Sequence, residues 1–185
     1  MNIRNLALVL ALIAGTMNAQ AQNSTRAQRA PTTAEIQRAP KTAETSVPSV
    51  TIGTQTWMQR NLDVLTFRNG DTIPQAAGDS AWMAAAENET PAWCYYNNDP
   101  ANGAVYGKLY NWYTTVDTRG LCPTGWHVPS ATEWNNLITE IGGVGSGYQL
   151  KLPGSSNWYN ASYVGSNPYG FNAKGAGIRY GTNGF

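Results

Sequence analysis

The chain has 185 residues, which is enough for one domain of ordinary size. Only 12% of its residues are charged, the formal net charge is +1, and Lys and Arg form no run anywhere in the chain. This composition argues against a nucleic-acid partner, because affinity for phosphate depends on clustered cations.

Residues 1–21 have the pattern of a signal peptide. Arg4 gives a positive start, an apolar run extends from Leu6 to Ala14, and Ala19-Gln20-Ala21 is a small-residue cleavage pattern. A transmembrane anchor would need about 20 apolar residues, roughly twice this run. We therefore expect an exported protein, extracellular or at the cell surface or outer membrane, with no transmembrane segment.

Residues 22–49 are expected to form a disordered linker. They are rich in Ala, Thr, Gln and Pro, and they contain no aromatic residue. Such a segment buries too little apolar surface to offset the entropy lost on ordering. All Trp, Tyr and Phe lie after residue 50, so the folded domain is expected over residues 50–185.

The first elements of this domain are predicted to be short strands. Residues 50–58 carry two β-prone stretches about Gly53 and Thr54 and should form a hairpin. Asn69-Gly70 predicts a second tight turn, since both central residues of that turn type need positive φ. Residues 92–96 are a further strand candidate.

Two helices are predicted next. Tyr106, Leu109, Tyr110 and Tyr113 recur at helical spacing. Ser130 and Glu133 then form the pattern of a capping box, and Gly142-Gly143 can end the helix that follows. The apolar face of this second helix would consist of Trp134, Leu137, Ile138 and Ile141.

The segments after residue 143 are rich in Gly and Asn and show no sustained periodicity. Long ordered loops and short antiparallel strands are expected there. Together with the two helices they give an α+β fold class.

Four ordered motifs resemble one known family. They are IGTQTWMQRNL at 52–62, YGKLYNWY at 106–113, GLCPTGWHVPS at 120–130 and GFNA at 170–173. They resemble the Fibrobacter succinogenes major paralogous domain over residues 50–185. That family occurs in exported and surface proteins of Bacteroidetes and Fibrobacteres, and its activity is largely uncharacterised. The resemblance implies a domain similar to the C-type lectin and sulfatase-modifying-factor fold.

The resemblance also implies further strands after residues 175–180, the last of them containing a Cys. The sequence ends at Phe185, so we expect a fragment or a shortened member of the family. The copper-binding cysteine pair of formylglycine-generating enzymes has no counterpart here, so their oxidase activity is not carried over. No cofactor is expected.

The residues that could carry catalysis are few. His127 is the only histidine, and its place between Trp126 and Val128 before a helix favours a structural role. Cys94 and Cys122 are expected to form a disulfide, since export removes the reducing environment. The resemblance instead implies that one of them pairs with the missing terminal Cys. No catalytic residue is assigned.

Metal binding has equally little support. Asn97, Asn98 and Asp99 offer oxygen ligands for calcium, but an Asx turn before Pro100 explains them as well. The sugar-binding signatures of C-type lectins are absent, so no metal site is expected.

The aromatic residues outside the regular elements are the remaining candidates for binding. Aromatic faces beside amides can stack on sugar rings or contact proteins, although the same rings can also pack inward to anchor a loop. The candidate residues are Asn157, Trp158, Tyr159, Asn160, Tyr163 and Tyr169. The leading hypothesis is a non-catalytic binding or adhesion module for glycan or protein at the cell surface. An enzyme of the sulfatase-modifying fold and a structural envelope component are the alternatives.

Overall fold

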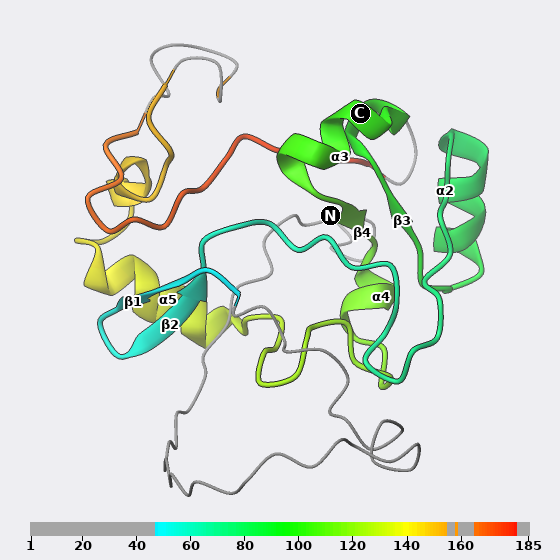
Figure 1. Cartoon of the computed structure of the whole chain (residues 1–185), viewed down its shortest axis with the longest axis horizontal. Coiled ribbons are helices and arrows are strands. Elements are labelled where there is room, and N and C mark those ends of the chain that lie inside the picture. Colours follow the sequence, from blue (N-terminus) through cyan, green and yellow to red (C-terminus); the bar gives the residue numbers. More distant parts are fainter. Residues whose placement is uncertain (1–46, 155–157, 159–164, 181–185) are drawn as a thin grey trace, which may run out of the picture. The chain divides into compact units, whose positions relative to one another are not determined.

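The computed structural model of the chain describes residues 47–154, 158 and 165–180. Helices and short antiparallel strands alternate along this part of the chain (Figure 1), which confirms the predicted α+β class. The predicted signal peptide lies outside the described residues, as does the predicted linker up to residue 46. Among the described helices, each is too short or too polar to cross a membrane.

The opening hairpin is confirmed. Strand β1 (Ser49–Ile52) pairs antiparallel with strand β2 (Gln55–Met58), and Ile52 lies opposite Gln55 across the turn. Gly53 has a φ of 58°, a conformation that favours glycine. Trp57 of β2 is 1% exposed, so the hairpin delivers a large aromatic ring into the core.

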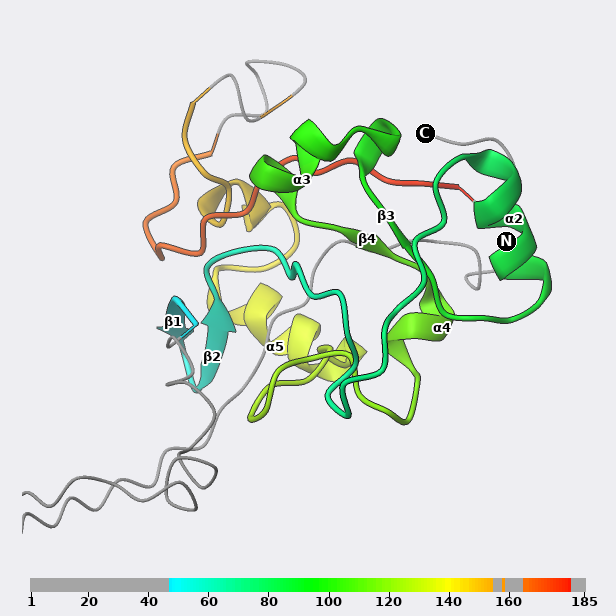
Figure 2. The ribbon, with the colours of Figure 1, turned by 45° about the vertical axis from the view of Figure 1, so that its right-hand side comes forward.

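The second predicted helix is also confirmed, as α5 (Ala131–Glu140). The Ser130 hydroxyl accepts the Glu133 N–H, and a Glu133 carboxylate oxygen accepts the Ser130 N–H at 2.7 Å. Leu137 and Ile141 are buried. The helix lies beside β2 (Figure 2), where the Gln55 amide donates to the Glu133 carbonyl oxygen at 3.2 Å.

Neutralising the capping carboxylate with Glu133→Gln should lower the free energy of unfolding by about 1 kcal/mol at pH 7. The hydrogen bond from the Ser130 N–H holds the pKa of Glu133 below its ordinary value of 4.5. A lowered folded-state pKa stabilises above the unfolded pKa, and this contribution is lost as the pH falls through the folded value. The penalty should therefore shrink as the pH falls below the ordinary pKa of a glutamate.

Urea unfolding at pH 7 and pH 3 measures this effect. Thr132→Ala is the matched control, because Thr132 is exposed in the same helical turn and makes no side-chain hydrogen bond to the described residues. A penalty of equal size at both pH values would show that the charge of Glu133 does not stabilise the helix.

The prediction of a helix through residues 106–113 is wrong. Helix α3 (Pro100–Tyr106) ends at the first residue of this range, and strand β4 (Leu109–Tyr110) and the single turn of α4 (Trp112–Thr115) follow it. Gly107 causes the break, since it adopts φ 71° and approaches the Leu62 carbonyl oxygen so closely that a Cβ would lie 2.7 Å from it. The aromatic recurrence therefore spans three elements.

The strand predicted at 92–96 is shorter than expected. Strand β3 (Trp93–Cys94) pairs antiparallel with β4, and a 3-10 turn (Tyr96–Asn98) follows it. Helix α2 (Asp79–Glu87), which the sequence pattern did not reveal, packs its Trp82 beside this sheet. The buried cluster there comprises Ala76, Trp82, Ala92, Cys94 and Leu109.

A turn forms at Asn69-Gly70, but not of the predicted type: Gly70 has a φ of 95°, whereas Asn69 does not have positive φ, and the Gly70 N–H donates to the Phe67 carbonyl oxygen at 2.9 Å. The residues on either side of this turn form a single antiparallel β-bridge, between Thr66 and Thr72, in place of two paired strands. After a 3-10 turn (Ser146–Gln149), Lys151 forms a parallel bridge with Ala173. Isolated bridges thus replace part of the expected strands.

Candidate functional site

A solvent-open groove lies where three segments distant in sequence meet. These are residues 58–63 after β2, residues 103–107 at the end of α3, and residues 171–174. Two adjoining cavities of about 20 and 210 Å³ form it, and they share five lining residues. The shared residues are Gln59, Arg60, Asn61, Asn172 and Lys174.

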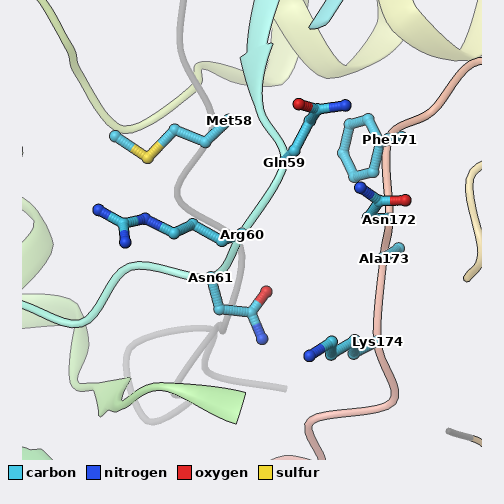
Figure 3. Close-up of a pocket in the computed structure, with 8 residues that line it drawn as sticks. All are labelled: Met58, Gln59, Arg60, Asn61, Phe171, Asn172, Ala173 and Lys174. Carbon is cyan, nitrogen blue, oxygen red and sulfur yellow. The ribbon is translucent and has the colours of Figure 1, made fainter. Parts of the chain in front are cut away.

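The first wall is built by alternation along the chain that leaves β2. Met58 and Arg60 project to one side, while Gln59 and Asn61 project to the other, toward residues 171–174 (Figure 3). The Gln59 amide nitrogen donates to the Gly170 carbonyl oxygen at 2.7 Å, and the Asn61 amide nitrogen donates to the Tyr106 carbonyl oxygen at 2.9 Å. Each of these amides ties the first wall to another segment.

The opposite wall, residues 171–174, is held from both sides. The side chains of Asn167 and Asn172 hydrogen-bond at 2.7 Å, and the Asn172 N–H donates back to the Asn167 side-chain oxygen at 3.1 Å. The Leu152 N–H donates to the Ala173 carbonyl oxygen at 2.8 Å. Phe171 is 3% exposed and packs against Trp57, with ring centroids 6.0 Å apart. The wall is therefore anchored in the core.

The groove keeps several hydrogen-bonding groups available. The Lys174 ammonium donates to the Val105 carbonyl oxygen at 3.1 Å, which uses one of its three protons. Among the described residues, the side-chain oxygens of Gln59 and Asn61 and the amide nitrogen of Asn172 have no hydrogen-bond partner. The groove can thus donate hydrogen bonds at one place and accept them at another.

The only carboxylate that lines the cavities, Asp63, is already neutralised. It pairs with Lys108, which is 5% exposed. The Lys108 ammonium also lies 5.0 Å from the ring centroid of Trp93 and 5.6 Å from that of Tyr95. By contrast, Arg60 and Lys174 form no ion pair with the described residues.

Of the predicted binding aromatics, the two that the structure describes, Trp158 and Tyr169, are not among the residues that line this groove. Trp158 is partly buried, its indole N–H donates to the Leu152 carbonyl oxygen at 2.9 Å, and the Lys151 ammonium lies 4.9 Å from its ring centroid. These contacts favour a loop-anchoring role. Tyr169 is also partly buried, next to the Gly170 that Gln59 contacts. Asn157, Tyr159, Asn160 and Tyr163 lie outside the described residues.

The two cysteines are buried and unjoined in the structure. Cys94 lies in the cluster beside Trp82, where burial raises the pKa of its thiol. Cys122 lies outside that cluster, and burial raises the pKa of its thiol to about 11. The expected disulfide between them is therefore not formed here, and neither thiol has the low pKa of a nucleophile.

The structure places His127 beside the cap of α5. Its Nε2 atom lies 2.7 Å from a carboxylate oxygen of Glu133, the residue that caps α5. The side chains considered above as calcium ligands also make local hydrogen bonds. Asp99 accepts the Ala101 N–H at 2.9 Å and caps α3, while the Asn98 side-chain oxygen accepts from the Gly78 N–H and from Arg179.

The described part of the chain contains no group of three or more His, Cys, Asp or Glu side chains placed to hold a metal ion. Apart from Tyr106, the groove residues were not singled out by composition or periodicity. Many of them belong to the motifs at 52–62, 106–113 and 170–173, whereas Asp63 and Lys174 belong to none.

Comparison with known proteins gives one match. The Fibrobacter succinogenes major domain matches residues 50–185. No curated protein and no solved structure matches the chain. Because the family match covers the groove and all the described helices, the chain belongs to the Fibrobacter succinogenes major domain family.

Proposed function

We propose that this chain is an exported, non-catalytic binding module that holds a glycan of the bacterial cell surface in the groove. The observation that carries the proposal is the pair of side-chain oxygens on Gln59 and Asn61. Their amide nitrogens are used to tie the walls together, so the amides are fixed while their oxygens have no partner among the described residues. Fixed acceptors of this kind suit the hydroxyl donors of a sugar.

The shape and lining of the groove support the same function. It is open to solvent, six of its fourteen lining residues have charged or amide side chains, and Tyr106 is among the others. A preformed site whose polar groups are already oriented loses less entropy on binding than a mobile one. The walls meet this condition because Phe171 and Asn172 are anchored on both sides.

Other features favour binding over catalysis. His127 is engaged in the cap of α5, and both thiols are buried with raised pKa values. The apolar run at Leu6 to Ala14 supports export, and the short strands joined by long loops suit a C-type-lectin-like fold. A surface location and an adhesive role fit these features together.

The experiment is a glycan screen with the chain that begins at Gln22, followed by titration of the best ligand. Asn61→Ala should weaken binding about fivefold, because one net hydrogen bond contributes about 1 kcal/mol. Asn136→Ala is the matched control, since Asn136 is an exposed asparagine of α5 with no side-chain partner in the described residues. Binding should survive chelation of divalent ions.

Thermal unfolding of Asn61→Ala must first show that the variant is folded, because Asn61 also contacts the Tyr106 carbonyl oxygen. Unchanged affinity in the folded variant would place the site elsewhere. Binding of surface proteins but of no glycan would replace the proposed ligand class, and loss of binding on chelation would contradict a metal-free site.

A further inference from the structure

We propose that the glycan held in the groove is acidic, and that Lys174 receives its carboxylate or sulfate group. This inference rests on the proposed function and adds the charge of the ligand to it. Lys174 lies on the anchored wall, and its side chain extends toward Asn61 across the groove (Figure 3). A sugar whose hydroxyls contact Asn61 would therefore bring a neighbouring substituent close to the Lys174 ammonium.

The first step of the argument is the local charge. Arg60, Asp63 and Lys174 are the charged residues that line the larger cavity. The ion pair with Lys108 compensates Asp63, so the Lys174 ammonium remains without a carboxylate partner in the described residues. Arg60 has none either, but its side chain projects away from residues 171–174 (Figure 3). The folded part of the chain has nine acidic and seven basic residues, a net charge of −2. The groove therefore carries positive charge, although the folded domain as a whole is negatively charged.

The second step is the supply of hydrogen-bond donors. Lys174 has two ammonium protons beyond the one that it gives to the Val105 carbonyl oxygen. The adjacent Asn172 adds an amide nitrogen that has no partner in the described residues. A carboxylate or a sulfate ester presents acceptor oxygens only, and charge-assisted hydrogen bonds are about twice as strong as neutral ones. An anionic group matches these donors better than a hydroxyl does.

The third step concerns the existing partner of Lys174. The Val105 carbonyl belongs to the C-terminal end of α3, where the helix dipole is negative and favours a cation. The bond to Val105 therefore holds the ammonium at the groove, and an anion can bind the two remaining protons without breaking it.

Calorimetric titrations with matched oligosaccharide pairs test this inference. Oligogalacturonate is compared with its methyl ester, and a sulfated galactan oligosaccharide with its desulfated form, so that the two sources of negative charge are separated. We expect at least one acidic member to bind about tenfold more tightly than its neutral partner at 20 mM salt. The difference should fall at 300 mM salt, because the charges are exposed to solvent.

Three variants localise the effect. Lys174→Met should abolish the preference for the acidic member, whereas Lys174→Arg should retain it. Asn136→Asp is the control, since it also lowers the net charge by one but lies on α5. It should leave the preference unchanged.

The outcomes separate the two proposals. Equal binding of acidic and neutral members, or a preference that persists in folded Lys174→Met, overturns the acidic ligand while the groove remains a glycan site. If Asn136→Asp loses the preference for acidic members as fully as Lys174→Met does, the preference depends on net charge, and the role of Lys174 is also overturned. If no glycan of either kind binds, the proposed function and this inference both fail.

Discussion

Truncating Trp57 to alanine should lower the free energy of unfolding by about 4 kcal/mol, within the 3 to 5 kcal/mol range for large aromatic residues in cores. Trp57 is 1% exposed. Its ring centroid lies 5.1 Å from that of Trp134 on α5 and 6.0 Å from that of Phe171 on the groove wall. The cavity would thus lie between the hairpin, the helix and the groove. Urea unfolding followed by circular dichroism measures the change.

A phenylalanine comparison separates packing from hydrogen bonding. The Trp57 indole N–H is buried and has no partner among the described residues, whereas that of Trp93 donates to the Ile73 carbonyl oxygen at 2.9 Å. Trp93→Phe leaves a buried carbonyl without this donor, which costs about 1 to 3 kcal/mol beyond lost packing. Trp57→Phe carries no such cost, so it should be the milder substitution. The reverse order would mean that the Trp57 N–H has a stabilising partner.

The parts of the fold predicted correctly from the sequence are those fixed by neighbouring residues. The capping box of α5 needs only Ser130 and Glu133, which are three residues apart. The turn of the opening hairpin needs only Gly53 and the β-prone stretches beside it. In each case the interactions that determine the element lie within a few residues, so the sequence pattern contains them.

The predictions that were wrong or incomplete depended on tertiary contacts. Gly107 interrupts the helical pattern of 106–113 because its backbone packs against the Leu62 carbonyl, 45 residues earlier. Helix α2 has no side-chain cap at Gly78 and buries only Trp82, so it lacks the periodic apolar face that would have indicated it. These features become visible only when distant segments are assembled.

The groove was missed for the same reason. Gln59, Tyr106 and Asn172 belong to three segments separated by more than 40 residues each, and no spacing rule relates residues so far apart. Residues 157–169 were predicted to bind a ligand because aromatic and amide side chains lie close together there in the sequence. The tryptophan of this segment is nevertheless tied to the Leu152 carbonyl and does not line the groove. Composition alone therefore located an aromatic cluster without showing which way its rings face.

Replacing Arg179 by methionine should lower the free energy of unfolding by about 3 kcal/mol. Arg179 is 0% exposed, and its guanidinium donates to the Asn98 side-chain oxygen at 2.6 Å and to the Asp79 carboxylate at 2.7 Å. It also lies 5.1 Å from the ring centroid of Trp82. The guanidinium thus joins residues 176–180 to α2 and to the turn after β3. Methionine fills much of the same volume but provides none of the hydrogen bonds.

The size of this effect decides between two physical outcomes. Burying a guanidinium removes its hydration, and that cost can cancel the gain from its partners, in which case an apolar replacement is nearly neutral. We expect a clear loss because Asp79 is more than half exposed, so the carboxylate pairs with Arg179 while keeping much of its own hydration.

Arg60→Met is the matched control; Arg60 is exposed and unpaired in the described residues, and its replacement should change stability by less than about 0.5 kcal/mol. If Arg179→Met unfolds at the wild-type urea midpoint, the buried charge contributes no net stability. A full loss should be accompanied by faster amide hydrogen exchange in residues 176–180 than in α5, because Arg179 anchors that segment and the capping box of α5 is left intact.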